Sequence, residues 1–236
     1  MTETASLSAR LDEVRTGIST ACTQAGRGND EITLIVVTKF HPAQLVRDLH
    51  ALGVRDVGEN RHQEAERKAA ELADLDLRWH FIGQLQSNKA RAALEYADVI
   101  HSIDRPSLVQ ALDRAWLERA SEQETVDPIA SFIQINLTDD PGRGGVNPHN
   151  LVAFAEDIAA RASFDIQGVM AVAPLDEEPD RAFERVANAA ELLRTVVPTA
   201  TSMSAGMSHD YASAIAHGAT HLRIGSAITG NRPVAG

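Results

Sequence analysis

The sequence contains one cysteine, Cys22, so no intramolecular disulfide can form. Proteins that depend on disulfides belong to oxidising compartments, and the lack of a pair favours a reducing one. No apolar run approaches the roughly 20 residues that a membrane-spanning helix needs. The N-terminal segment MTETASLSAR also lacks the apolar core of a signal peptide. We therefore expect a cytoplasmic protein that has no contact with a membrane.

Basic residues are scarce as well. The chain of 236 residues has 22 Lys and Arg against 33 Asp and Glu, a formal net charge of −11. This balance disfavours nucleic-acid binding, which needs a basic face. The nine histidines show no HExxH or HxH spacing, so we expect no metal site. Only three of the basic residues are lysines, and such a chain can retain a lysine for chemistry that arginine cannot perform: Lys39, Lys68 and Lys89.

The hydrophobic pattern alternates between helix and strand along the chain. Residues 7–21 place apolar side chains on one helical stripe, and ITLIVVTK (32–39) is an apolar, β-branched run typical of a strand buried on both faces. Further strands are predicted at 54–57, 79–83, 98–103, 130–136, 166–172, 200–204 and 220–225. Further helices are predicted at 42–51, 61–73, 87–96, 105–122, 149–162, 179–196 and 209–217.

Eight strands that alternate with helices predict a single (β/α)₈ TIM barrel over residues 32–230, within one domain that spans 1–236. After the last strand only AITGNRPVAG remains, so we expect the extra N-terminal helix, within 1–25, to cover the wall where the last helix is short. An open doubly wound sheet is the alternative, but it usually has a glycine-rich turn where this chain has TKFHP. The loop TDDPGRGGVNP (138–148) is expected at the C-terminal rim, where this fold builds its site.

Lys39 closes the first apolar strand, which would place its amine at the top of the barrel. Partial loss of solvent disfavours an ammonium group, and a Schiff-base lysine needs this effect. An ordinary surface lysine at a strand end is the alternative, and scarcity and placement alone leave both open.

Two turns near the C-terminus are rich in small residues. Residues 204–208 (SAGMS) lead into a helix, and Gly225 and Ser226 open a short helix after the last strand. Helix N-termini offer unpaired N–H groups, and in barrels the loops after strands seven and eight often hold a phosphate. Ordinary turn glycines and capping serines are the alternative. A phosphate held by backbone dipoles is compatible with an acidic protein.

Arg223 lies on the last predicted strand, inside the barrel or at its mouth, where an unpaired charge is costly. It would pair in a core salt bridge or donate to a heteroaromatic ring nitrogen, a contact that tunes pyridoxal 5′-phosphate (PLP). Because arginine stays protonated, it would keep a pyridine nitrogen unprotonated. A lysine for an aldehyde, a dipole cradle for a phosphate and an arginine for a ring nitrogen together describe PLP as the ligand.

The order of several short motifs resembles that of the pyridoxal phosphate homeostasis protein family over residues 32–230. The motifs are VVTKFHP (36–42), VGEN (57–60), WHFIGQLQSNK (79–89), SIDR (102–105), IQIN (133–136), GVMAV (168–172), SAGMSHDYASAI (204–215) and GATHLRIGSAITG (218–230). The resemblance implies a barrel similar to the N-terminal domain of alanine racemase, with Lys39 as the lysine that carries PLP as an aldimine. It further implies that Arg223 contacts the pyridine nitrogen and that Asn60 and His80 line the ring pocket. The phosphate would be held by Ser204, Met207, Ser208, Gly225 and Ser226.

Three functions remain open: a PLP carrier, an amino-acid racemase or decarboxylase, and a Schiff-base aldolase on a phosphosugar. A two-base racemase needs an acid/base group on the ring face opposite the lysine, and neither Tyr96 nor Tyr211 is an obvious candidate. The racemase relatives take that group from an additional C-terminal β domain, which we expect this chain to lack. An aldolase would leave Arg223 without a role. The sequence therefore favours a non-catalytic, monomeric carrier that stores or delivers PLP, with apo PLP-dependent enzymes as recipients.

Overall fold

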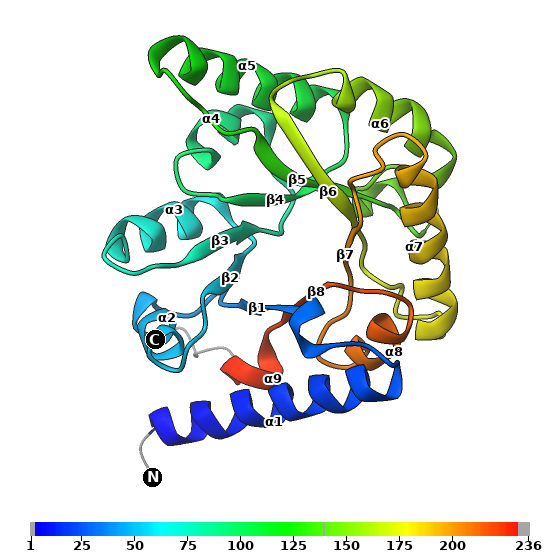
Figure 1. Ribbon diagram of the computed structural model, residues 1–236. Helices are drawn as coiled ribbons and strands as arrows, with labels where there is room; N and C mark the ends of the chain where they lie inside the picture. The colour runs from blue at the N-terminus through cyan, green and yellow to red at the C-terminus, as the bar shows by residue number, and fades with distance from the viewer. Residues whose placement is uncertain (1–2, 139, 231–236) are drawn as a thin grey trace.

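Eight short strands close into a parallel barrel in chain order, with β8 paired to β1 (Figure 1). The computed structural model describes residues 3–138 and 140–230. This is the predicted barrel, and each strand ends within two residues of its predicted bounds. The strands are β1 (Thr33–Val37), β2 (Asp56–Glu59), β3 (Arg78–Phe81), β4 (Val99–Ile103), β5 (Ile129–Gln134), β6 (Phe164–Met170), β7 (Ser202–Ser204) and β8 (His221–Ile224).

Helices connect the strands on the outside of the barrel, so each crossover leads to the next parallel strand (Figure 1). The predicted helix at 87–96 is divided into a 3-10 turn, Ser87–Lys89, and a short α-helix. The α-helices are α1 (Glu3–Gln24), α2 (Ala43–Ala51), α3 (His62–Glu71), α4 (Ala90–Ala93), α5 (Pro106–Glu122), α6 (Leu151–Ala159), α7 (Pro179–Arg194), α8 (Tyr211–Ala216) and α9 (Ser226–Thr229). No helix among the described residues is both long and apolar enough to cross a membrane.

The N-terminal helix α1 packs against α8 and α9, next to the seam where β8 meets β1 (Figure 1). The helix after β8, α9, has only four residues, and α1 covers the wall that it leaves. The covering face is the predicted apolar stripe, which is buried in the core: Leu7, Leu11, Val14, Ile18 and Ala21. The last part of the predicted tail, residues 231–236, lies outside the described residues.

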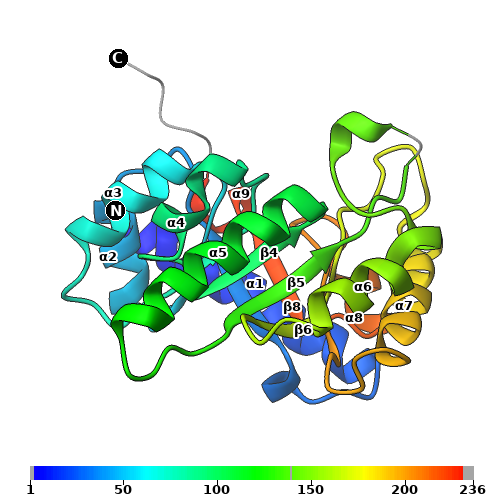
Figure 2. The same cartoon turned by 90° about the horizontal axis from the view of Figure 1, so that it is seen from above.

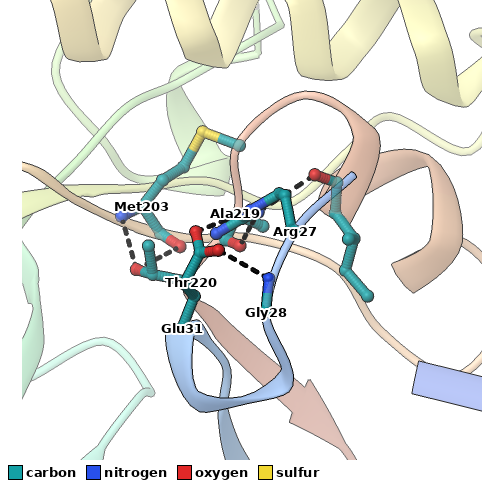
Figure 3. Close-up of polar contacts among 7 residues, drawn as sticks. Arg27, Gly28, Glu31, Met203, Ala219 and Thr220 are labelled. Atoms are coloured by element: carbon teal, nitrogen blue, oxygen red, sulfur yellow. Dashed lines mark hydrogen bonds and ion pairs between the residues drawn. The ribbon is translucent and has the colours of Figure 1, made fainter. Parts of the chain in front are cut away.

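Polar contacts fasten the end of α1 to the start of β8 (Figure 3). The guanidinium of Arg27 donates to the carbonyls of Ile215 and Ala219 at 3.0 and 2.6 Å, so it satisfies acceptors at the end of α8. Beside it, Thr33 N–H donates to the Thr220 carbonyl at 2.7 Å, and the β1–β8 pairing begins there. The first and last strands are therefore joined through both backbone and side-chain contacts.

The predicted rim loop, 138–148, leaves β5 and projects beyond the barrel before α6 (Figure 2). Its described residues include a 3-10 turn, Pro141–Arg143, and a second such turn follows at Pro148–Asn150. The loop is tied back by a hydrogen bond from Val146 N–H to the Gln134 carbonyl at 2.7 Å.

The packing of α1 leads to a stability prediction. Leu11 is 1 % exposed, so Leu11→Ala removes buried apolar surface and leaves a cavity against the barrel wall. We expect the free energy of unfolding, measured by urea denaturation, to fall by about 2–5 kcal/mol. The matched control is Glu13→Ala, an exposed position on the same helix, which should change it by less than about 0.5 kcal/mol. Equal stability of both variants would show that α1 does not support the barrel.

Candidate functional site

A cavity of about 470 Å³ opens at the C-terminal ends of the strands. Its wall comes from the segments that follow β1, β2, β3, β6, β7 and β8, so residues far apart in the sequence meet there. Active sites of this fold lie at the same end of the barrel. Seven of the nine residues predicted to contact a ligand line this cavity: Lys39, Asn60, Met207, Ser208, Arg223, Gly225 and Ser226.

Lys39 lies two residues past the end of β1, half-buried, with its side chain in the cavity wall. The next residue, Phe40, has φ = 69° and is the one non-glycine residue with positive φ in the described part of the chain. Such a conformation persists where surrounding contacts enforce it, and it is common beside functional groups. The turn that carries Lys39 is therefore strained and held in place.

Side chains of α3 hold the two peptide groups that flank Lys39. The ammonium of Lys68 donates to the Thr38 carbonyl at 2.9 Å. On the other side of Lys39, Phe40 N–H donates to Glu64 Oε1 at 2.6 Å. Because Lys68 and Glu64 also pair with each other at 2.7 Å, one ion pair brackets the lysine backbone from both directions.

Glu59, at the end of β2, completes this buried cluster. Its Oε1 accepts from Lys68 Nζ and from Thr38 Oγ1, both at 2.7 Å. Burial raises the pKa of Glu59, while the neighbouring Lys68 opposes the rise. Glu59 therefore forms a buried salt bridge with Lys68. Lys68 itself is 2 % exposed, and the sequence assigned it no role.

The turns after β7 and β8 supply small residues to the cavity wall. Gly206 has φ = +95°, and a Cβ there would come within 2.8 Å of the Ala214 side chain, so glycine is required. The turn then brings Met207 and Ser208 to the cavity wall, opposite Gly225 and Ser226. The N–H groups that open α9 have no acceptor within their own helix. This part of the wall is suited to an anionic group.

Arg223 is 5 % exposed and still reaches the cavity. Its guanidinium donates to Ser204 Oγ at 2.7 Å and to the Ala171 carbonyl at 2.8 Å, which leaves donors for a ligand. Burial lowers the pKa of Arg223 to about 10, so it remains a cation at neutral pH. Among the described residues no carboxylate lies within ion-pair distance of the Arg223 guanidinium. Arg223 therefore does not form the core salt bridge that the sequence allowed as one interpretation.

Ser204 and His80 do not lie in the cavity wall. Ser204 is fully buried, and its hydroxyl is engaged by Arg223 and by His101 Nδ1, so it lies behind the arginine instead of at a phosphate. His80 is 1 % exposed and contacts His101 and Asp56 inside the barrel. The physical reason is that both side chains are engaged inside the barrel. Ser204, the last residue of β7, contacts Arg223 and His101, and His80 contacts His101 and Asp56. Both support the site from beneath.

Several wall residues were not singled out from the sequence. His41 follows the Lys39 turn, His209 follows Ser208, and Ile82 and Val172 follow β3 and β6. Each lies within five residues of a strand end, so the rule that barrel loops build the site would have found them. Burial lowers the pKa of His41, and the nearby Lys68 lowers it further.

The segment WHFIGQLQSNK contributes mainly to a second cavity of about 530 Å³, which shares Asn60 with the first. Gln84, Gln86 and Lys89 lie in its wall. Lys89 closes the 3-10 turn that precedes α4, so it lies at the start of a helix. No group of three His, Cys, Asp or Glu suited to hold a metal ion occurs in the part of the chain that the structure describes.

The sequence model of the alanine racemase N-terminal domain family matches residues 10–233. The chain belongs to this family. The curated pyridoxal phosphate homeostasis protein of Mycobacterium leprae is 38 % identical over 232 residues, which cover 93 % of this chain and 90 % of that protein. The predicted family resemblance is therefore confirmed.

Solved structures agree with this family assignment. PipY of Synechococcus elongatus PCC7942, solved without PLP and with PLP bound, is 36 % identical, with TM-scores of 0.82 and 0.81. Each comparison covers 94 % of this chain and 99 % of PipY. Alanine racemase from Corynebacterium glutamicum shares the fold at 20 % identity and a TM-score of 0.68, and the match covers 96 % of this chain but 62 % of the racemase.

The cluster beneath Lys39 generates a prediction. Lys68→Met leaves the buried carboxylate of Glu59 and the partly buried one of Glu64 without their cation. We expect the free energy of unfolding at neutral pH to fall by about 3–5 kcal/mol. Burial raises the pKa of Glu59 in the folded protein. A carboxyl group of this kind stabilises the folded state at pH values below its unfolded-state pKa. The stabilisation is lost as the pH rises through its folded-state pKa. The loss in free energy of unfolding caused by Lys68→Met should therefore shrink as the pH is lowered towards the ordinary pKa of glutamate.

The control is Lys89→Met, the same chemical change at a half-buried position outside the cluster. Urea denaturation at several pH values measures both variants. A loss in Lys68→Met that is small, or that is independent of pH, would contradict the role of the cluster.

Proposed function

We propose that this protein binds PLP in the 470 Å³ cavity and acts in PLP homeostasis as a carrier that stores and delivers the cofactor. The observation that carries the proposal is the convergence, in one cavity wall, of the lysine Lys39, the buried cation Arg223 and the small-residue turns. The names of the curated relatives and the PLP-bound structure of PipY support it.

The residues present fit PLP in size, charge and donor pattern. The cavity volume lies in the range of small-molecule sites. Asn60 Oδ1 is buried without a hydrogen-bond partner in the described protein, and an unsatisfied acceptor of this kind is completed by a donor on a ligand. The cation at Arg223 and the N–H groups that open α9 offer separate contacts for a ring nitrogen and a phosphate.

Each wall residue then has a distinct task. The aldehyde of PLP supplies reversible covalent bonding to a primary amine, and the Lys39 amine is the one in the cavity wall. Ser208, Ser226 and the N–H groups that open α9 would hold the phosphate, with Met207 and Gly225 beside it. Arg223 would donate to the pyridine nitrogen and keep it unprotonated, which limits the electron withdrawal that amino-acid chemistry on PLP requires.

The position of the tyrosines favours a carrier over a racemase. Tyr96 Oη contacts His62 Nδ1 at 3.3 Å, and Tyr211 lies against Gly17 of α1. Neither tyrosine lines the cavity, where the ionisable side chains besides Lys39 and Arg223 are His41 and His209. The proposal includes a cytoplasmic monomer that hands PLP to apo-enzymes, as the sequence suggested.

The first test is covalent trapping. Purified protein mixed with PLP and reduced with borohydride should carry one cofactor at Lys39, identified by mass spectrometry of the peptides. Lys39→Ala should abolish both the visible absorbance and the label, because no other lysine among the described residues lines the cavity. Lys89→Ala, which alters the neighbouring cavity, should retain both. A label that persists in Lys39→Ala would refute the site assignment.

The second test separates a carrier from an enzyme. Loaded protein mixed with an apo PLP-dependent enzyme should restore the activity of that enzyme as absorbance leaves the carrier. The same loaded protein should not racemise or decarboxylate amino acids, assayed by chiral chromatography and by release of carbon dioxide. Turnover that is lost in Lys39→Ala and reduced in His41→Ala or His209→Ala would overturn the carrier proposal in favour of an enzyme.

A further inference from the structure

A chain of hydrogen bonds runs through the barrel interior from Arg223 to Asp56. Arg223 Nη1 lies 2.7 Å from Ser204 Oγ, and Ser204 Oγ lies 2.9 Å from His101 Nδ1. His101 Nε2 lies 2.9 Å from His80 Nδ1, and His80 Nε2 lies 2.9 Å from Asp56 Oδ1. Arg223 lies on β8, and the other four residues lie on β7, β4, β3 and β2 in turn. The chain of hydrogen bonds therefore crosses the interior of the barrel.

The two ends of the chain lie in different surroundings. Arg223 lines the 470 Å³ cavity at the C-terminal ends of the strands. Asp56 is the first residue of β2, and it lines a separate cavity of about 420 Å³ with residues of α1 and the segments before β1 and β2. The Asp56 side chain is 26 % exposed, whereas the three residues between the ends are almost completely buried.

Both histidines are neutral because burial lowers their pKa values, that of His101 far below its ordinary range. His80 also faces Asp56 and Asp98, which raise its pKa, and Arg78, which lowers it. His101 faces His80, Arg223, His221 and Arg78, all of which lower its pKa. A neutral imidazole has one N–H donor and one acceptor nitrogen, so each ring can pass a hydrogen bond in only one direction.

The carboxylate of Asp56 fixes that direction for the whole chain. A carboxylate accepts only, so His80 must carry its proton on Nε2 and accept at Nδ1. His101 must then carry its proton on Nε2 and accept at Nδ1 from the Ser204 hydroxyl. Ser204 Oγ in turn accepts from Arg223, which is always a donor. Every bond therefore points from the guanidinium to the carboxylate, and each group is satisfied.

We propose that Asp56 is a positioning residue for Arg223 that acts through this one-way chain of hydrogen bonds. The carboxylate at one end of the barrel sets the histidine tautomers, the tautomers orient the Ser204 hydroxyl, and that hydroxyl holds one arm of the guanidinium. The Ala171 carbonyl holds the other arm at 2.8 Å. The chain rests on the hydrogen-bond geometry and on the neutral state of its two histidines, and its effect on PLP rests on the function proposed above.

The first experiment tests the chain without PLP. ¹⁵N NMR of the histidine rings in the unloaded protein should show His80 and His101 as neutral rings with the proton on Nε2. Asp56→Ala should give a mixture of tautomers at His80, because Nε2–H loses its acceptor. Asp56→Asn should retain the Nε2–H form, because the asparagine oxygen can accept. A protonated ring in the wild type, or tautomers that Asp56→Ala leaves unchanged, would refute the chain.

The second experiment tests its effect on the cavity. Asp56→Ala should weaken PLP binding by about fivefold, the effect of one ordinary hydrogen bond, and should shift the absorbance maximum of the bound cofactor. Asp56→Asn should restore the affinity to within about twofold. Asp98→Asn is the matched control, since Asp98 accepts from Trp79 N–H beside the chain without belonging to it.

Asp56→Ala protein that is folded by circular dichroism and binds PLP with wild-type affinity and spectrum would overturn the positioning role. Equal losses of PLP affinity in Asp56→Ala and Asp98→Asn would also overturn the positioning role, because the removal of any nearby negative charge would then explain the result. Wild-type protein that binds no PLP would refute the proposed function instead, and the NMR experiment would still decide whether the chain exists.

Discussion

The pairing of β8 with β1 is the constraint on which the site depends. In this register Ile35 is the partner of Arg223, and Val36 is the partner of Ile224. The pairing brings the last strand, which carries Arg223, beside the strand that leads to Lys39. In the sequence Lys39 and Arg223 are 184 positions apart. The pairing also places the turn at Gly225 and Ser226 next to Val37. Without this closure, the lysine and the arginine would not share a cavity.

Buried polar clusters make the two sides of that cavity rigid. Lys68, Glu59 and Glu64 hold the backbone around Lys39, and the His80–His101–Ser204 series holds Arg223. An unsatisfied buried polar group is costly, so each cluster tolerates few arrangements and fixes the group above it. This rigidity suits the proposed reversible binding through one lysine and several dipoles, because donors that are already oriented lower the cost of binding.

Much of the fold could be predicted because the strands are short apolar runs that alternate with helices. ITLIVVTK is typical of a strand buried on both faces, and it forms β1. Six of the seven predicted residues that line the cavity follow strand ends, where the rule for barrels is simple, and Arg223 lies on β8. Ser204 and His80 are engaged by partners inside the barrel, and a sequence does not show which polar groups a side chain meets there. Lys68 was passed over because its partners come from three different elements.

The sequence by itself determined the alternation of strands and helices, the position of Lys39 at a strand end and the small residues of the two C-terminal turns. These features depend on local propensity and on periodicity, which a linear chain contains in full. Only the tertiary structure decided which polar side chains reach the cavity and which support it from beneath. That division depends on strand register and on hydrogen bonds between residues far apart in the sequence, such as His101 and Ser204, which are 103 positions apart. Such contacts exist only once the barrel has closed.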